Sequence, residues 1–569
     1  MHSLYKVFVL STLCYVSFLG SSHAADGYCC RKESCFPSKT QIDNFEATLD
    51  GRVVMDSDNE YEAATLMYNT VRQMYPSIVA MVNSVGDIQK AILFAREHNL
   101  FVTVRSSGHD YSGRSTANNS LNINLSEMKD YEVKTDSSRS SSGELKVQTG
   151  RTWIEIYELL DQYDRVIVGG SGKTVTTGGY TLGGGHSPIS KTYGLAVDNL
   201  LEMQLVLPDG RIATCTETQT VIEHMDGTIE TLQDGDLFWA VRGGGGGTYG
   251  VTVYNVFKLH PAPQSMVLLS VTIPLKVHVP YADFTEPVFE IVKKFNSLPD
   301  EWGGYFIFHN WDVTYKKEDT GLDNDLKTTG SLSLHINKLA PWDGTEHDAF
   351  TGLISFCNTY DIPYTFSNQS SFYEYAKLAG DPPSVRTSLA TTLLQPGKQN
   401  NEFTQFFKKQ LFDEFKAKNI FLACTGTLLG GQVKRFAADS TPLSPGFRTA
   451  SSCLSCGVGL ADPNSVLAQF EDFVIGEGNK FSESLQRFGD GMYLNEPTRA
   501  NADWKKDFWG SHYNRLLTIK RRYDPDNFFT CHHCVGSDDN AGQVTCDAPR
   551  FLCNYFCVML VAFLYAILK

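Results

Sequence analysis

The apolar positions of the chain change their period near residue 80. Two continuous apolar runs lie at residues 78–82 and 101–104. Between them, Ile88, Ala91, Ile92 and Ala95 occupy positions i, i+3, i+4 and i+7. That spacing places the four side chains on one face of a helix, whereas short apolar runs flanking it are typical of buried strands. The segment therefore predicts a strand, a helix over 85–99 and a second strand.

The pattern along the rest of the chain divides it into segments. A helical pattern at 40–48 follows three cysteines, and short strands with glycine turns continue to about residue 261. An aromatic, glycine-poor stretch follows, before helix and turn signals return. We expect an α+β fold with an N-terminal segment containing cysteines (25–59), a glycine-rich domain (60–263), a second α+β domain (264–480), a C-terminal return (481–531) and a terminal spacer and tail (532–569).

The N-terminus has the pattern of a secretory signal peptide. Lys6 precedes an apolar run from Val7 to Leu19, and small residues follow up to Ala24. This order predicts a leader spanning 1–24 and cleaved after Ala24. An N-terminal membrane anchor is the alternative, but it requires about 20 apolar residues.

The C-terminus is also apolar, from Phe551 to Leu568. A polar spacer (543–550) separates this tail from the small residues that follow Asn540. This arrangement matches the signal for a glycolipid (GPI) anchor, whose tail is removed. A single membrane span and a buried terminal helix are the alternatives. The predicted location is the secretory pathway and then the extracellular space or cell surface, with membrane contact only through this tail.

Charge and cysteine content narrow the class of protein. The chain has 49 basic and 64 acidic residues, a net charge of −15, which disfavours nucleic acids as partners. Loss of the leader and tail would leave ten of the 14 cysteines, and all ten can pair in an oxidising compartment. We therefore expect disulfides, not structural zinc, at Cys453-x-x-Cys456 and Cys531-His-His-Cys534, and no metal site.

Three sequons indicate a glycoprotein. They begin at Asn118, Asn124 and Asn368. Because Asn124 lies in an alternating run that predicts a strand, we do not expect it to carry a glycan.

Three glycine-rich loops carry the strongest chemical signal. They lie at 105–113, 178–187 and 242–250, and the last contains five consecutive glycines. Glycine lets backbone amides approach a ligand closely and form concavities that bind anions. The three loops together predict a large ligand with a flat ring and phosphates.

These loops and three further stretches resemble a known family. Arg105-Ser-Ser-Gly-His-Asp-Tyr-Ser-Gly113, the Gly-Gly-Tyr-Thr-Leu-Gly-Gly-Gly-His-Ser loop, Asp236–Gly244 and Phe508–Phe529 resemble the FAD-linked oxidases of the vanillyl-alcohol oxidase superfamily, in particular the berberine-bridge-enzyme-like branch. The resemblance implies a PCMH-type FAD-binding domain of two subdomains and a substrate domain with an antiparallel sheet. It also implies that the chain returns to the FAD domain at its C-terminus.

The resemblance implies roles for individual residues. His109 matches the histidine that bears the covalent 8α link to FAD. The cysteine of a second link is replaced by Gly172, so one link is expected. The residues expected to bind the cofactor are His109, Arg105, Ser106, Ser107, Gly108, Asp110, Tyr111, Gly113, Val175, Gly178, Gly179, Gly183, Gly184, Gly185, Gly250, Val251 and Asn495.

The resemblance also points to the catalytic groups. Tyr493 matches the tyrosine that acts as a base in relatives that oxidise carbohydrates, and His186 lies where relatives place an aromatic residue beside the substrate. Glu496 stands where many relatives have a second tyrosine, and it is a secondary candidate. Val175, a small aliphatic residue at the position that governs access of O₂, favours an oxidase.

The resulting expectation is a secreted or cell-surface FAD-dependent oxidase. Tyr493, aided by His186, would take the proton of an alcohol or sugar hydroxyl, and hydride would pass to flavin N5. O₂ would reoxidise the flavin and form H₂O₂. A flavin dehydrogenase with another acceptor and a non-catalytic surface binding protein of the same fold are the alternatives.

Overall fold

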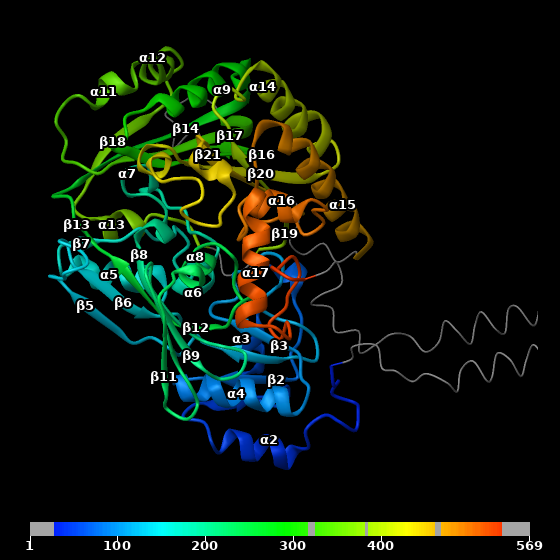
Figure 1. Ribbon diagram of the computed structural model, residues 1–569. Helices are drawn as coiled ribbons and strands as arrows, with labels where there is room; N and C mark the ends of the chain where they lie inside the picture. The colour runs from blue at the N-terminus through cyan, green and yellow to red at the C-terminus, as the bar shows by residue number, and fades with distance from the viewer. Residues whose placement is uncertain (1–27, 317–324, 382–384, 461–467, 538–569) are drawn as a thin grey trace, which may run out of the picture.

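The structure is a computed structural model that describes residues 28–316, 325–381, 385–460 and 468–537. The predicted leader and the apolar tail lie outside the described residues, so their predictions remain untested. Figure 1 shows two layers: the N-terminal half of the chain forms the lower part and residues from about 266 to 485 form the upper part. No helix within the described residues is long and apolar enough to cross a membrane.

The first sheet contains the predicted strand–helix–strand unit. Strands β2 and β3 each pair in parallel with β4, and β1 pairs antiparallel with β2. Ser84 caps the helix by accepting a hydrogen bond from the backbone of Asp87, and the four predicted apolar positions are fully buried. The elements are α2 Lys39–Glu46, β1 Arg52–Val54, α3 Tyr61–Thr65, β2 Ile78–Met81, α4 Val85–Glu97, β3 Val102–Arg105 and β4 Leu121–Asn124. The sheet thus begins at Arg52, earlier than the domain boundary expected at residue 60.

The second sheet is antiparallel, with the order β11-β10-β9-β8-β12-β6-β5. Val206, Val251 and Val253 share one core with the first sheet, so the two sheets pack as one body. The elements are β5 Tyr131–Lys134, β6 Glu144–Gln148, α5 Trp153–Asp161, β7 Arg165–Val166, α6 Thr177–Leu182, α7 Ser190–Tyr193, β8 Leu200–Val206, β9 Ile212–Cys215, β10 Thr220–Glu223, β11 Ile229–Leu232, α8 Asp236–Val241, β12 Val251–Lys258 and β13 His260–Pro261.

The third sheet is antiparallel, as expected for the substrate domain, with the order β15-β14-β17-β16-β20-β21-β19 and with β18 paired to β14. Helices cover its outer face at the top of Figure 1. The strands are β14 Met266–His278, β15 Tyr281–Asp283, β16 Trp302–Tyr315, β17 Leu326–Lys338, β18 Tyr364–Gln369, β19 Thr387–Leu394, β20 Ile420–Leu428 and β21 Ser452–Leu460. The helices are α9 Thr285–Lys294, α11 Glu346–Ala349, α12 Thr351–Thr359, α13 Phe372–Ala376, α14 Asn401–Lys408, the π-helix η4 Lys409–Phe415 and α15 Ala468–Leu485.

Side chains of the third sheet alternate between its two faces, because successive residues of a strand point in opposite directions. On β16, Phe306 and Phe308 enter the core under the helices, whereas Tyr305 and Ile307 face the first two sheets. The second set of side chains lies over the glycine loops and forms one wall of a cavity.

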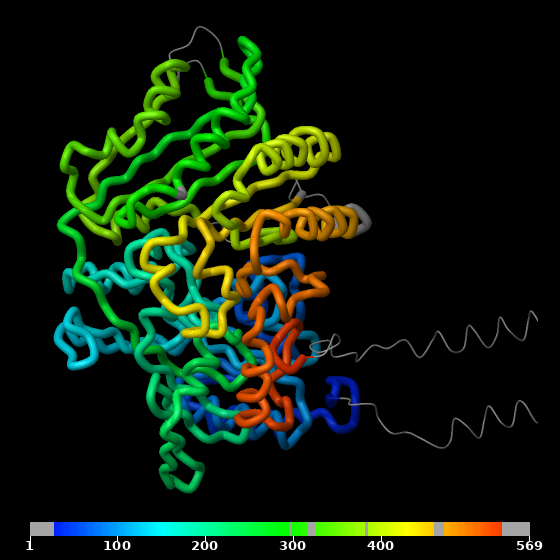
Figure 2. The backbone as a smooth tube through the Cα atoms, turned by 45° about the horizontal axis from the view of Figure 1, so that its top comes forward, coloured from blue at the N-terminus to red at the C-terminus, as the bar shows by residue number. Residues whose placement is uncertain are grey.

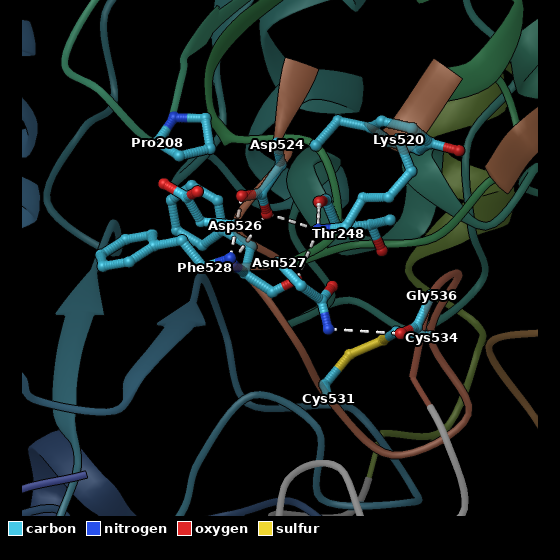
Figure 3. A network of polar contacts seen from close by, with 12 residues as sticks. Pro208, Thr248, Lys520, Asp524, Asp526, Asn527, Phe528, Cys531, Cys534 and Gly536 are labelled. Atoms are coloured by element: carbon cyan, nitrogen blue, oxygen red, sulfur yellow. Dashed lines mark hydrogen bonds and ion pairs between the residues drawn. A yellow bond between two sulfur atoms is a disulfide. The ribbon is translucent and has the colours of Figure 1, made fainter. Parts of the chain in front are cut away.

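The C-terminal segment returns to the first two sheets, as the tube in Figure 2 shows. Its helices are α16 Trp504–Trp509 and α17 Tyr513–Tyr523. The buried Lys520 ammonium donates to the carbonyls of Thr248 and Phe529 at 2.6 and 2.7 Å and to Asp524 Oδ2 at 2.5 Å (Figure 3). The lysine thereby ties the third glycine loop to this segment.

The cysteines correct one expectation. Disulfides join Cys29 to Cys35, Cys424 to Cys456 and Cys531 to Cys534. Disulfides are thus present at Cys456 and at Cys531 and Cys534, as expected, whereas Cys453 keeps a free thiol because Cys424 faces Cys456 directly across strands β20 and β21. Three buried thiols are free, Cys215, Cys357 and Cys453, so the ten cysteines between the predicted leader and tail do not all pair.

The three sequons differ in their exposure. Asn124 is 2% exposed in β4, in agreement with the expectation that it carries no glycan, whereas Asn118 and Asn368 are exposed.

Candidate active site

One cavity of about 710 Å³ lies between the glycine loops and the third sheet. Its floor comes from the first two glycine loops and part of the third. Its roof comes from strands β16, β19, β20 and β21, through Tyr305, Ile307, Thr387, Leu389, Phe421, Ala423, Thr425, Thr427, Ser455 and Gly457. The cavity therefore requires both layers of the fold, and its volume suits an organic ligand.

His109 stands on the wall of the cavity with its orientation fixed. Its ring stacks on Tyr68 with a centroid distance of 4.0 Å, and its Nε2 lies 2.8 Å from Thr174 Oγ1. Burial lowers the pKa of His109 to about 4, so the imidazole is neutral at ordinary pH. A neutral imidazole retains one nitrogen lone pair, which makes His109 a competent nucleophile.

The glycines of the loops have different tasks. A Cβ on Gly178 would lie 2.6 Å from Ser106 Oγ, and one on Gly183 would lie 2.2 Å from Asn495 Oδ1, so these glycines allow segments to pack closely. Gly179 and Gly247 line the cavity and have no atom within 4 Å of their Cβ positions. They leave open backbone surface toward a ligand.

Asp110 anchors the first loop. Its carboxylate accepts hydrogen bonds from the backbone of Ser112 at 3.0 Å and of Arg114 at 2.9 Å. It also accepts one from the Arg114 side chain at 2.8 Å. Arg114 continues to the carbonyl of Leu494 at 2.9 Å. The first loop is thus joined to the segment that carries Tyr493 and Asn495.

Tyr493 also lines the cavity, in a nearly water-free position. It is 2% exposed, and Asn495 Nδ2 donates to its hydroxyl at 3.0 Å. Burial, followed by the charge of Glu496, raises the pKa of Tyr493 well above its ordinary value. The side chain is therefore a neutral phenol.

Glu496 and His186 form a close pair beside this tyrosine. Glu496 Oε1 lies 3.3 Å from His186 Nε2, within the range of an ion pair although not aligned as a hydrogen bond. Burial acts to raise the pKa of Glu496, but the charge of the nearby His186 and the hydrogen bond donated by the Ser455 hydroxyl outweigh it and lower that pKa. The His186 ring meets the Tyr493 ring edge-on at 4.8 Å. The site holds an ionised carboxylate next to an imidazole and a phenol.

The donor atoms of His186, Cys453 and Glu496 lie within 4.8 Å of one another. This spacing is compatible with a single metal ion. The second set of this kind within the described residues, Cys29, Glu33 and Cys35, has its two sulfurs joined in a disulfide.

Two segments of the chain match known families. Residues 76–216 match the family described as "FAD binding domain", and residues 492–536 match "Berberine and berberine like". A flavin-dependent oxygenase, ucdF of Aspergillus ustus, is 30% identical over 486 residues, which cover 82% of each chain. The VAO-type flavoprotein oxidase VAO615 of Thermothelomyces thermophilus is 29% identical over 475 residues, or 82% of this chain and 76% of its own.

The chain belongs to the berberine-bridge-like branch of the VAO-type FAD-linked oxidoreductases.

Solved structures agree with this fold. The VAO-type flavoprotein MtVAO713 from Myceliophthora thermophila aligns with a TM-score of 0.73 at 21% identity, covering 90% of this chain and 97% of its own. The carbohydrate oxidase of Microdochium nivale aligns with a TM-score of 0.67 at 21% identity, covering 87% and 99%. The glucooligosaccharide oxidase of Acremonium strictum, which carries a 6-S-cysteinyl, 8α-N1-histidyl FAD, aligns with a TM-score of 0.67 at 18% identity, covering 87% and 98%.

The oxidoreductase takes FAD as its cofactor, and the cavity fits that group. The open backbone of Gly179 and Gly247 and the neutral imidazole of His109 face the same space. The predicted residues that line it are Ser106, Ser107, Gly108, His109, Asp110, Tyr111, Val175, Gly179, His186, Tyr493 and Asn495.

Other predicted residues of the oxidoreductase lie behind the cavity wall. Arg105 is buried, and its Nη2 donates to the carbonyl of Leu66 at 2.7 Å. Val251, in strand β12, is fully buried in the core that the first two sheets share. Gly250 packs against the Val206 carbonyl. The others in this group are Gly113, Gly178, Gly183, Gly184 and Gly185, which shape the loops.

Several residues that line the cavity were not predicted from the sequence. Tyr68 and Asp381 come from segments without a recognisable motif, and the roof residues come from ordinary alternating strands. Gly246 and Gly247 belong to the third glycine loop, whose five consecutive glycines were the available signal.

Proposed function

We propose that this protein is a secreted or cell-surface FAD-dependent oxidase that oxidises an alcohol or a sugar hydroxyl. The observation that carries the proposal is that His109 lines the same cavity as the His186, Tyr493 and Glu496 side chains. Such a cavity holds a cofactor and a small organic substrate side by side. Solved structures of the same fold that are named carbohydrate oxidases support the substrate class.

We propose one covalent link to FAD, through His109. His109 is a neutral, oriented imidazole on the cavity wall. Gly172, at the position of the second attachment residue of relatives, also lines the cavity but has no side chain to form a bond. Ser107, Gly108, Gly179 and Asn495 would hold the cofactor beside it.

The protein's part in the reaction is to move a proton and orient the substrate. The bound flavin supplies the hydride acceptor, and O₂ takes up the electrons as H₂O₂. The neutral phenol of Tyr493 donates a hydrogen bond to the substrate oxygen. The His186–Glu496 pair accepts the hydroxyl proton, because Glu496 is ionised and both groups face the cavity.

An oxidase is distinguished from a dehydrogenase by its electron acceptor. Val175 faces the cavity, and its small side chain leaves room for O₂. Under air, purified protein and substrate should produce H₂O₂ in proportion to product. A Val175→Leu variant should reoxidise more slowly with O₂ and retain its rate with an artificial acceptor. A Val175→Leu variant that O₂ reoxidises at the wild-type rate would contradict the role of Val175.

Passage through the secretory pathway is supported by the three disulfides within the described residues, which persist in oxidising compartments. N-terminal sequencing of the mature protein tests cleavage after Ala24, and release by a phospholipase specific for GPI tests the anchor.

The decisive experiment is anaerobic mixing of the purified protein with a panel of sugars and simple alcohols. A substrate bleaches the oxidised flavin absorbance, and admission of air restores it. A yellow protein that no alcohol or sugar bleaches would reject the substrate class. A colourless protein that FAD does not reconstitute would favour the non-catalytic binding protein.

A further inference from the structure

A chain of hydrogen bonds leads from the third sheet's side of the cavity to His109. Asp381, in the segment before β19, accepts from the Thr174 backbone N–H at 2.7 Å and from the Thr174 hydroxyl at 2.8 Å, both at Oδ2. Thr174 Oγ1 in turn lies 2.8 Å from His109 Nε2. The three residues lie in two different layers of the fold.

The direction of this chain follows from its chemistry. A carboxylate only accepts, and a threonine hydroxyl has one proton to give. Because Thr174 gives that proton to Asp381, its oxygen can only accept from His109. The proton of the neutral imidazole therefore resides on Nε2, and the lone pair resides on Nδ1.

Nδ1 is accordingly the nucleophilic atom of His109. Among the described residues, no hydrogen bond to Nδ1 is present, and the stacked Tyr68 fixes the plane of the ring. In glucooligosaccharide oxidase the histidyl link to FAD is at N1, the nitrogen equivalent to Nδ1.

We propose that Thr174 and Asp381 are positioning residues for covalent attachment of FAD. They hold His109 in the tautomer that presents Nδ1, and the Asp381 carboxylate stabilises the positive charge that the ring gains on alkylation, as an aspartate does for a catalytic imidazole. This inference rests on the histidyl link of the proposed function.

The step balances with O₂ as the oxidant. A bond forms between Nδ1 and the carbon of the flavin 8-methyl group, one C–H bond of that methyl breaks with release of its proton, and the alkylated imidazolium then releases its Nε2 proton. The two electrons of the C–H bond reduce the flavin ring, and O₂ then takes up two electrons and two protons as H₂O₂. The product is the protein plus FAD minus two hydrogens, with the flavin oxidised.

The test measures the rate of attachment to the full-length apoprotein incubated with FAD under air. Covalent flavin is read by fluorescence after denaturing electrophoresis and by intact mass, and non-covalent binding is read by absorbance of the native protein. Asp381→Asn and Thr174→Val should attach FAD about tenfold more slowly, the effect expected from loss of one hydrogen bond to a charged group. The amide of an asparagine at position 381 can donate a hydrogen bond to Thr174 Oγ1. The Thr174 hydroxyl then donates to His109 Nε2, which favours the tautomer whose proton is on Nδ1.

Matched variants separate this role from simple contact between the two segments. Lys173 Nζ donates to the Lys377 carbonyl at 2.8 Å, so Lys173→Met breaks a neighbouring contact without touching His109. Lys173→Met and Thr174→Ser should attach FAD at the wild-type rate.

Three outcomes would overturn the inference. The first is wild-type attachment in both Asp381→Asn and Thr174→Val, and the second is an equal loss in Lys173→Met. The third is wild-type protein with no fluorescent band, which rejects the histidyl link itself. If Asp381→Asn does not fold, Thr174→Val decides, because it leaves the Asp381 segment unchanged.

Discussion

Glu496 Oε1 lies 3.3 Å from His186 Nε2 on the wall of the cavity that His109 also lines. His186 lies in the second glycine loop, and Glu496 comes from the C-terminal return, three residues after Tyr493. We propose that this pair, and not Tyr493, acts as the base, because burial and Glu496 raise the pKa of Tyr493 whereas the pKa of Glu496 is lowered.

Replacing the carboxylate should slow the chemical step. Glu496→Gln is expected to lower the rate of anaerobic flavin reduction roughly 10²–10⁴-fold, the usual contribution of a general base. Tyr493→Phe should lose less, because it removes a hydrogen bond to the substrate. Stopped-flow absorbance measures both, with the exposed Glu483→Gln as the control. A larger loss in Tyr493→Phe would return the role of base to the tyrosine.

The Glu496 carboxylate should determine how the rate of flavin reduction depends on pH at acidic pH. Because the pKa of Glu496 is below its ordinary value, the carboxylate stays ionised at mildly acidic pH. The rate of flavin reduction should therefore persist through that range and fall only as pH drops through the lowered pKa. A rate that already falls near pH 6–7, the unperturbed range of a histidine, would assign the limiting ionisation to another group.

Buried histidines should make the fold sensitive to acid. Burial lowers the pKa of His260 to about 4, so below about 6.5 the unfolded chain takes up a proton that the folded chain cannot. Stability should fall between pH 6.5 and 4, by about 3 kcal/mol for one such histidine. His260→Gln should flatten this dependence in urea unfolding, and the exposed His347→Gln should not. Identical slopes for wild type and His260→Gln would disprove the assignment.

The ammonium of Lys520 should be essential to the C-terminal return. Lys520→Met leaves the Asp524 carboxylate buried without its ion pair and removes the bonds to Thr248 and Phe529. The cost should be about 3–5 kcal/mol, as for other broken buried pairs. Unfolding in denaturant measures it, with the neighbouring exposed Arg521→Met as control. A loss under about 1 kcal/mol, the size of a surface pair, would show that the network contributes little.

Position 172 should decide the number of flavin links. Wild-type protein is expected to carry flavin on one residue, and Gly172→Cys should gain a second link. The backbone of Gly172 is outside the left-handed region, and an added Cβ would meet only Val175, at 2.9 Å. Peptide mass mapping counts the links, and Gly172→Ala controls for the added bulk. Flavin on two residues of the wild type would refute the single link.

The sequence alone determined the cofactor side of this protein. The apolar spacing of residues 85–97 is set by local helix geometry, so α4 could be read directly. The glycine loops could also be recognised, because a backbone that must approach a ligand leaves glycines in the sequence, whereas only the family resemblance pointed to His109. The C-terminal return was recognised by resemblance, and residues 492–536 match the berberine-like family.

Only the tertiary structure showed which residues of the third sheet line the cavity. Ile307, Ala423 and Thr425 are ordinary residues of alternating strands, and no local pattern says which face of a sheet will cover a cavity. The pairing of Cys424 with Cys456, the Glu496–His186 contact and the Asp381–Thr174–His109 chain each join segments that are distant along the chain. Such contacts depend on how whole layers pack, whereas the periodicity of a sequence records only the local geometry of each element.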